Sequence, residues 1–283
     1  MLLTPRYDGS PFLTIDGAPD DVVVPLTRQR RRLLATLAEL DDAQWAASSR
    51  CDGWTVQDVV AHLVGVDAFW QGSVVAGLAG TPTSYLAGFD PAATPPMMVD
   101  GMRSLAPAEV LDQFRSACDG YLDAVADLDD ASWGLLAESP AGHVTVRILC
   151  AHALWDAWIH ERDILLPLGL TPAEEPDEIL TCLRYAAVLS PTFALSQGTA
   201  VQGTYTVEVT DPDHGFALTV TDSVALSDPP LPAGAPCLRG PAVDLVEALS
   251  MRQPLPAATP VEWQELMVGL ATVFDSTVET ASA

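Results

Sequence analysis

One stretch near the middle of the chain, Thr145–Gly169, reads TVRILCAHALWDAWIHERDILLPLG and decides the predicted fold. It predicts a helix from Thr145 to about Leu166, because Pro167 and Gly169 are typical of the end of a helix. Several helices of this length in one chain favour a helical bundle.

Three further segments have the pattern of bundle helices. They span Val22–Leu40, Thr55 to about Gly77, and Glu109–Leu128. In the second segment Thr55 can cap the first turn and Asp58 can complete a capping box. The four helices predict an up-down four-helix bundle, and the loop Gly80–Pro107 between the second and third is long enough to cover a site.

The pattern changes after a fifth helical segment, Asp177–Leu189. Thr204–Thr210 and Phe216–Thr221 alternate as strands, and helical segments follow at Pro241–Met251 and Pro260–Phe274. The sequence therefore predicts the α+β fold class. A four-helix bundle would occupy residues 1–172, a small α+β domain would occupy residues 173–283, and the two would meet around a cleft.

The charge of the chain limits its partners. Its 38 acidic and 13 basic residues give a net charge of −25, which repels phosphate backbones and anionic membranes. We therefore expect no nucleic-acid partner and no membrane binding. All the basic residues are Arg, and the lack of Lys excludes Schiff-base chemistry. The basic run Arg28–Arg32 is interpreted as a solvated helix face.

The cysteines and the apolar segments favour a cytoplasmic protein. The five cysteines are dispersed and odd in number, which argues against a disulfide framework and suits a reducing cytosol. Cys51 is interpreted as a buried, inert thiol, which would be a nucleophile only if a base adjoined it. The N-terminus lacks the pattern of a secretory signal, and polar residues interrupt the apolar stretch Val59–Gly80, which predicts a buried helix.

Two of the five histidines share the helix after Thr145 with an acidic residue. His152, Asp156 and His160 stand at i, i+4 and i+8, so they form one stripe along the helix. A pair of ligating side chains at i, i+4 can meet one metal ion. His62, in the middle of the second helix among apolar residues, is the candidate for a third ligand.

Spacing alone leaves this site open. His62 and His152 could be ordinary core histidines, and Asp156 could pair with an Arg. If the site does bind metal, three ligands with nitrogen and oxygen donors would leave one exchangeable position. That pattern is typical of catalytic zinc and also suits nickel or iron.

Longer stretches resemble the mycothiol-dependent maleylpyruvate isomerase family, whose members are relatives of DinB-type bundle proteins. They are LDDAQWAASSRCDGWTVQDVVAHLVG, WDAWIHERDILLPLG and LRGPAVDLVEALSMRQPL. The resemblance implies that His62, Asp156 and His160 hold a divalent metal. Asp156 stands where the family usually has Glu, so the shorter carboxylate could let His152 compete as a ligand.

The resemblance also implies a reaction. Mycothiol would be the co-substrate, activated as a thiolate, and would add to an electrophilic small molecule in an isomerase or a thiol S-transferase from an actinobacterial source. Arg252 and Arg239 are the catalytic candidates, because an arginine can hold a substrate carboxylate. Two alternatives stay open: a metal-stabilised bundle with a non-catalytic binding or regulatory role, and a thiol-independent metal hydrolase or lyase. We expect a monomer or a homodimer.

Overall fold

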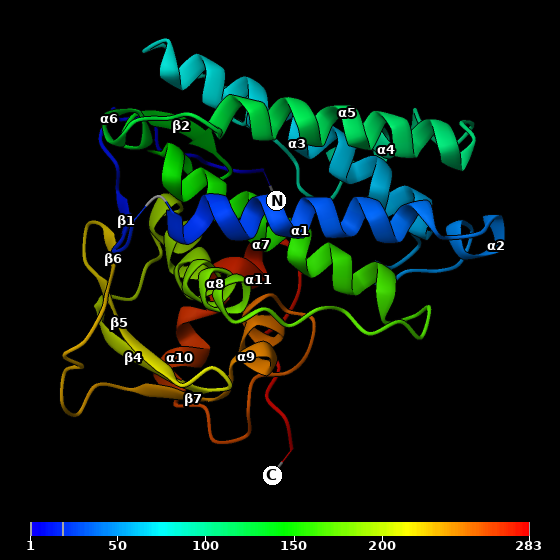
Figure 1. Ribbon diagram of the computed structural model, residues 1–283. Coiled ribbons are helices and arrows are strands. Elements are labelled where there is room, and N and C mark those ends of the chain that lie inside the picture. The colour runs from blue at the N-terminus through cyan, green and yellow to red at the C-terminus, as the bar shows by residue number, and fades with distance from the viewer. Residues whose placement is uncertain (1, 19, 283) are drawn as a thin grey trace.

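The structure is a computed structural model that describes residues 2–18 and 20–282. Four long helices form its N-terminal half: α1 (Asp20–Ala38), α3 (Val56–Leu78), α5 (Pro107–Val125) and α7 (Val146–Leu165). Helix α3 packs along α5, α1 packs along α7, and cross contacts close the group (Figure 1). The predicted four-helix bundle is confirmed.

Local signals explain where these helices begin. Thr55 caps α3: its hydroxyl accepts the Asp58 N–H at 3.2 Å, and an Asp58 carboxylate oxygen accepts the Thr55 N–H at 3.0 Å. Thr145 caps α7 in the same manner. The predicted capping box is therefore present. Three short helices lie between the long ones: α2 (Asp42–Trp45), α4 (Thr94–Asp100) and α6 (Asp130–Trp133).

The second half contains a five-stranded sheet and four helices. Its elements are α8 (Pro176–Ser196), β4 (Gly203–Thr210), β5 (His214–Val220), β6 (Val224–Ser227), β7 (Cys237–Pro241), α9 (Ala242–Leu249), α10 (Val261–Leu266) and α11 (Val268–Val273). The fifth strand, β1 (Leu13–Ile15), comes from the N-terminal segment, and the strand order is β1-β6-β5-β4-β7. The α+β fold class is confirmed, although the helix predicted over Pro260–Phe274 is two helices that meet at Met267.

The N-terminal segment crosses to the other half of the molecule. Strand β1 (Leu13–Ile15) pairs in parallel with β6, so the first strand of the chain forms an edge of the second half's sheet. On its way it passes the hairpin β2 (Leu136–Ser139) and β3 (Gly142–Thr145). There a Cβ on Gly142 would lie 2.1 Å from the Arg6 carbonyl oxygen, so only glycine fits.

Helix α8 lies in the middle of the fold. It packs on α7 and α1 of the bundle and, on its other side, on α9, α11 and β6 (Figure 1). Helices α3 and α8 are long and apolar enough to cross a membrane, but 50% and 72% of their most apolar windows are buried inside this fold. Because both helices pack among other elements, they are interpreted as core helices.

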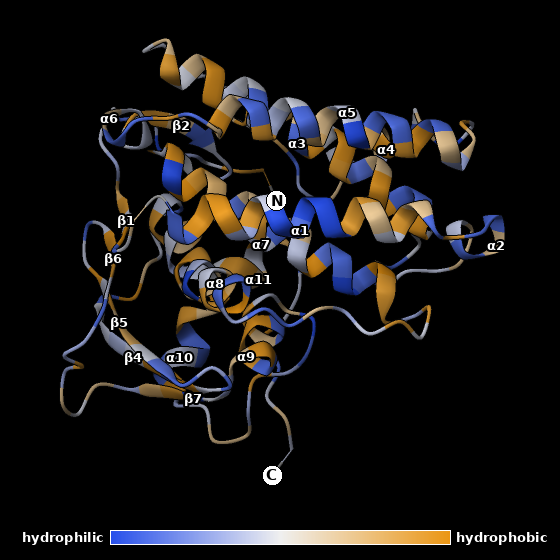
Figure 2. Ribbon diagram, viewed as in Figure 1, coloured by the Kyte–Doolittle hydropathy of each residue, from blue (hydrophilic) through white to orange (hydrophobic). Residues whose placement is uncertain are grey.

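The charged run on α1 corrects one prediction. Figure 2 shows a hydrophilic middle on α1, and we expected Arg28–Arg32 to be a solvated face. Arg30 is instead 0% exposed and pairs with Asp67 of α3, while Arg32 reaches Glu161 and Glu178 at 2.8 and 2.7 Å. The run is therefore a solvated face only in part: the Arg31 side chain is 54% exposed, whereas Arg30 and Arg32 meet acids on α3, α7 and α8 inside the bundle.

Candidate metal centre

The three predicted ligands meet between two helices. His62 lies on α3, and Asp156 and His160 lie one turn apart on α7. One ligand atom from each residue falls within 4.8 Å of the others, and His160 Nε2 is 3.7 Å from Asp156 Oδ1. The imidazole rings of His62 and His160 stand edge to face, with centroids 5.0 Å apart. This arrangement gives two nitrogens and one carboxylate oxygen around one point.

The charge state of the cluster suits a cation. Burial lowers the pKa of His62 to about 4, so its ring is neutral at physiological pH and offers a lone pair. Burial raises the pKa of Asp156, but the adjacent histidines outweigh it and lower the pKa overall, so the carboxylate stays ionised. Asp156 Oδ2 is buried and has no hydrogen-bond partner among the described residues. A buried anionic oxygen without a donor is what a bound cation would satisfy.

A second carboxylate orients His160. The His160 Nδ1 is 3.1 Å from an oxygen of Asp163, which is 0% exposed. Burial lowers the pKa of His160, but Asp156 and the Asp163 hydrogen bond raise it to about 10 in the metal-free protein. A donor bond from Nδ1–H to Asp163 leaves Nε2 to face His62 and Asp156, the arrangement that supports histidine ligands in metal sites.

Two arginines hold that carboxylate in place. Arg50 Nε lies 3.0 Å from Asp163, and Arg252 Nη2 lies 2.9 Å from it. Sequence reasoning did not single out Asp163. The available signal was its place one turn after His160 on the same helix, which brings its side chain to the same face.

The structure separates the two candidate arginines. Arg252 lies beside the cluster, and both line one large cavity. Arg239 is 63% exposed on β7, pairs with Glu208 at 3.0 Å, and is not among the residues that line the cavity.

His152 and Cys51 lie at the edges of the cluster. His152 Nδ1 is 2.7 Å from the Tyr185 hydroxyl. His152 is in neither group of side chains close enough together to hold an ion: the described cluster, or Cys51 with His160 and Asp163. Cys51 Sγ lies 3.7 Å from His160 Nδ1 and 3.3 Å from Asp163. The prediction of a buried thiol is wrong, because Cys51 is partly exposed and lines the cavity.

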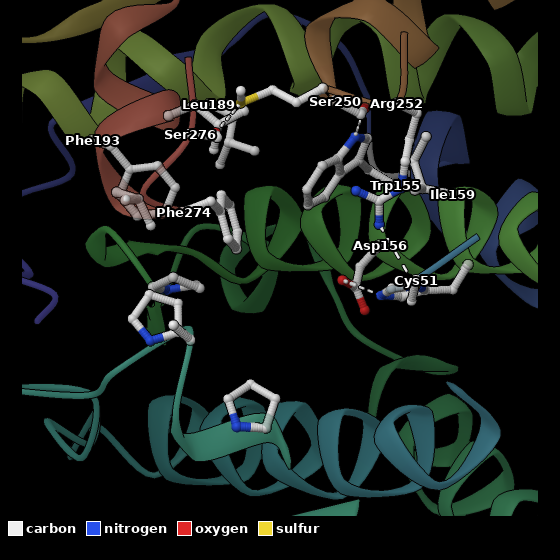
Figure 3. A pocket seen from close by; sticks show the side chains of 18 of the residues that line it. Cys51, Trp155, Asp156, Ile159, Leu189, Phe193, Ser250, Arg252, Phe274 and Ser276 are labelled. Atoms are coloured by element: carbon white, nitrogen blue, oxygen red, sulfur yellow. Dashed lines mark hydrogen bonds and ion pairs between the residues drawn. The ribbon is translucent and has the colours of Figure 1, made fainter. Parts of the chain in front are cut away.

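A large cavity opens over the cluster. Its volume is about 1120 Å³, and its wall includes His62, Asp156 and His160. Figure 3 shows Asp156, Cys51 and Arg252 converging at one end of it. The loop between α3 and α5 contributes Leu86 and several neighbours to the wall, so the loop lines the cavity.

The fold and the cluster define a bundle protein with two histidines and one carboxylate at the wall of a deep cavity. Residues 26–165 match the family described as the mycothiol maleylpyruvate isomerase N-terminal domain. This match covers the bundle, and it confirms the resemblance identified from the motifs. Among curated proteins, none matches the chain.

Two solved structures share the fold. They are the crystal structures of the mycothiol-dependent maleylpyruvate isomerase and of a histidine-to-alanine mutant of it. Each superposes with a TM-score of 0.60 over 84% of this chain and 91% of the other, at 16% and 15% sequence identity. At this identity the likeness shows a common fold.

Proposed function

We propose that this chain is an enzyme that uses a divalent metal and mycothiol to add a thiol to an electrophilic small molecule. The observation that carries the proposal is the cluster of His62, Asp156 and His160 within 4.8 Å at a cavity wall, with Asp156 Oδ2 lacking a donor. Zn²⁺ is the first candidate and Ni²⁺ or Fe²⁺ are the alternatives, because imidazole and carboxylate ligands suit all three.

Each residue has a distinct task in this proposal. His62 supplies a neutral nitrogen, Asp156 supplies negative charge, and His160 supplies Nε2 with its ring fixed by Asp163. When bound, a divalent cation lowers the pKa of a coordinating thiol so that the thiol is deprotonated. Three protein ligands leave room for such a thiol on the cavity side.

Arg252 is the residue proposed to hold the substrate. Its Nε and Nη2 contact Asp163, whereas its Nη1 has no hydrogen-bond partner within the described part of the chain. A guanidinium with one free edge suits a single carboxylate or enolate oxygen. Arg239 has no part in this proposal, because it lies away from the cavity.

The chemistry has two possible ends. The sulfur forms a bond to one carbon of a conjugated double bond, and the electron pair of that double bond moves to the conjugated carbonyl as an enolate. If rotation about the new single bond and loss of the sulfur follow, the double bond forms again, the thiol is returned and the enzyme is an isomerase. If a proton is instead added to the neighbouring carbon and the adduct is released, the enzyme is an S-transferase. The alternative of a non-catalytic module is disfavoured by the cavity over the cluster and by a ligand group that contains three side chains within residues 2–18 and 20–282.

Three further parts of the proposal concern the setting. We place the enzyme in the cytoplasm of an actinobacterium, as a monomer or a homodimer. We also place the domain boundary near residue 172, between α7 and α8, with the first strand contributed to the second domain.

The test combines metal analysis with thiol titration. Purified protein should contain about one divalent ion per chain, and turnover of an α,β-unsaturated carbonyl compound should require both that ion and mycothiol. Chelation should abolish turnover, and adding the metal back should restore it. Turnover of the same compound at an equal rate without any thiol would support a metal-dependent hydrolase or lyase instead.

A further inference from the structure

The cavity points to a substrate class. We infer that the electrophile is an extended, mainly apolar molecule with no more than one anionic group. This inference rests on the proposed function and adds the identity of the substrate class to it. Three observations support it: one end of the cavity is mainly apolar, the arginines of the cavity are already paired with acids, and the cavity is large.

One end of the cavity is walled mainly by apolar side chains, with Ser276 as a polar side chain beside Leu189 (Figure 3). Leu189 and Phe193 of α8 face Phe274, which follows α11, and Figure 3 shows these three side chains at the opposite end from Asp156 and Arg252. Leu270 and Val273 of α11 line the same wall. Polar groups placed here would lose their water without gaining partners, at about 1–3 kcal/mol each. Hydrocarbon placed here would gain about 0.8 kcal/mol for each buried CH₂.

The arginines of the cavity have little capacity left for anions. Arg50 contacts Asp163 once and Glu247 twice, at 3.0, 2.8 and 3.1 Å. Two of the three guanidinium nitrogens of Arg252 donate hydrogen bonds to Asp163. Asp52, Asp275 and Glu279 also line the cavity. A dianionic substrate would therefore find one free guanidinium edge and several like charges, inside a protein of net charge −25.

The cavity is large enough to hold the thiol at one end and the electrophile at the other. At about 1120 Å³ its volume slightly exceeds the usual range of ligand pockets, about 300–1,000 Å³. The hydroxyl-rich thiol needs hydrogen-bonding groups, and Ser250 and Gln253, close to Arg252 in the chain, are among the residues that line the cavity. That leaves the end formed by Leu189, Phe193 and Phe274 for the electrophile.

A graded series of substrates tests the inference. We would use 1-alken-3-ones with alkyl chains from methyl to octyl, together with a short unsaturated dicarboxylate. We expect kcat/KM to rise about threefold to fourfold per methylene until the cavity is filled, the factor that corresponds to about 0.8 kcal/mol. The dicarboxylate should be the poorest of the set. A dicarboxylate preferred over every alkenone would overturn the inference.

A matched pair of variants locates the effect. Val268 begins α11 and Phe274 follows its end, and the two are 52% and 51% exposed, but only Phe274 lines the cavity. We expect Phe274→Ser to lower kcat/KM for the octyl compound about tenfold and to reduce the gain per methylene. Val268→Ser should leave both values unchanged. Equal effects of the two substitutions would contradict the assignment.

A binding measurement separates this inference from the proposed reaction. Saturated dialkyl ketones lack the double bond that conjugate addition needs, so calorimetric titration with them in the absence of thiol reports the cavity alone. Affinity that rises with chain length and falls in Phe274→Ser would support the inference even if no thiol-dependent turnover were found. In that case only the proposed reaction would fail. Affinity independent of chain length would overturn the inference even in an active enzyme.

Discussion

Two carboxylates inside the same bundle differ in how they are satisfied. Asp67 and Arg30, both 0% exposed, form two hydrogen bonds of 3.0 and 2.7 Å, and the Cys118 thiol adds a contact of 3.3 Å. Asp156 faces two histidines, and its Oδ2 has no donor among the described residues. The comparison teaches that burial of an acid does not by itself mark a ligand site. A buried carboxylate oxygen that lacks a hydrogen-bond donor is the feature that points to one.

The largest expected effect is the loss of stability when the ion pair of Arg30 and Asp67 is broken. Asp67→Ala leaves the Arg30 charge buried and unpaired, so the free energy of unfolding should fall by about 3–5 kcal/mol. Urea denaturation of the metal-free proteins measures this loss. The double variant Arg30→Met with Asp67→Leu removes both charges and should recover most of it. A loss below about 1 kcal/mol for the single variant would show that the pair is not a structural element.

Substitutions in the cluster of His62, Asp156 and His160 should change the amount of bound metal. His62→Ala or His160→Ala should remove most of the bound divalent ion, because each deletes one of three ligands. His152→Ala is the matched control on the same helix and should keep the ion, since its ring bonds to Tyr185. Elemental analysis of the purified variants gives the result. Full occupancy in His62→Ala would refute the assignment.

The carboxylate itself should matter by a smaller factor. Asp156→Asn keeps the size of the side chain but removes its charge, so we expect metal affinity to fall about 10- to 100-fold. Asp156→Glu, which keeps an anionic oxygen on a longer chain, should lose less. Competition with a chromogenic chelator measures both affinities. If Asn and Glu behaved alike, the charge of Asp156 would not be its contribution.

The smallest effect is a dependence on pH. In the metal-free protein the pKa of His160 is raised from 6.5 to about 10, so its protonation adds stability that is complete below pH 6.5 and is lost as the pH rises through 10. A cation needs the neutral ring, so its binding at pH 8 should release about one proton. Calorimetry in buffers of different ionisation enthalpy counts that proton. No release at pH 8 would mean that His160 is already neutral.

Much of the bundle was predictable from sequence, because helix caps and prolines are local signals. Thr55, Asp58, Pro167 and Gly169 placed helix ends within a few residues of those observed. The stripe of Asp156 and His160 follows from helical spacing alone. Convergence with His62 needed the family resemblance, because no local rule says which faces of two helices meet.

The missed elements depend on partners far along the chain. Strand β1 is only three residues long and is stabilised by β6, more than half the sequence away. The burial of Arg30 depends on Asp67 lying opposite it, and the role of Asp163 depends on Arg50 and Arg252 from two other segments. Such pairings have no signature in the spacing of either partner.

The strand Leu13–Ile15 has a consequence for how the protein is made. The bundle helices leave the ribosome early, whereas the sheet stays open at the β6 edge until that early strand docks, which requires residue 226 to have been synthesised. A truncation that removes the first fifteen residues would leave β6 as a bare edge, ready to pair with another chain. Shortened versions should therefore aggregate while their isolated bundles remain helical, and a fusion partner is better attached at the C-terminus than at the N-terminus.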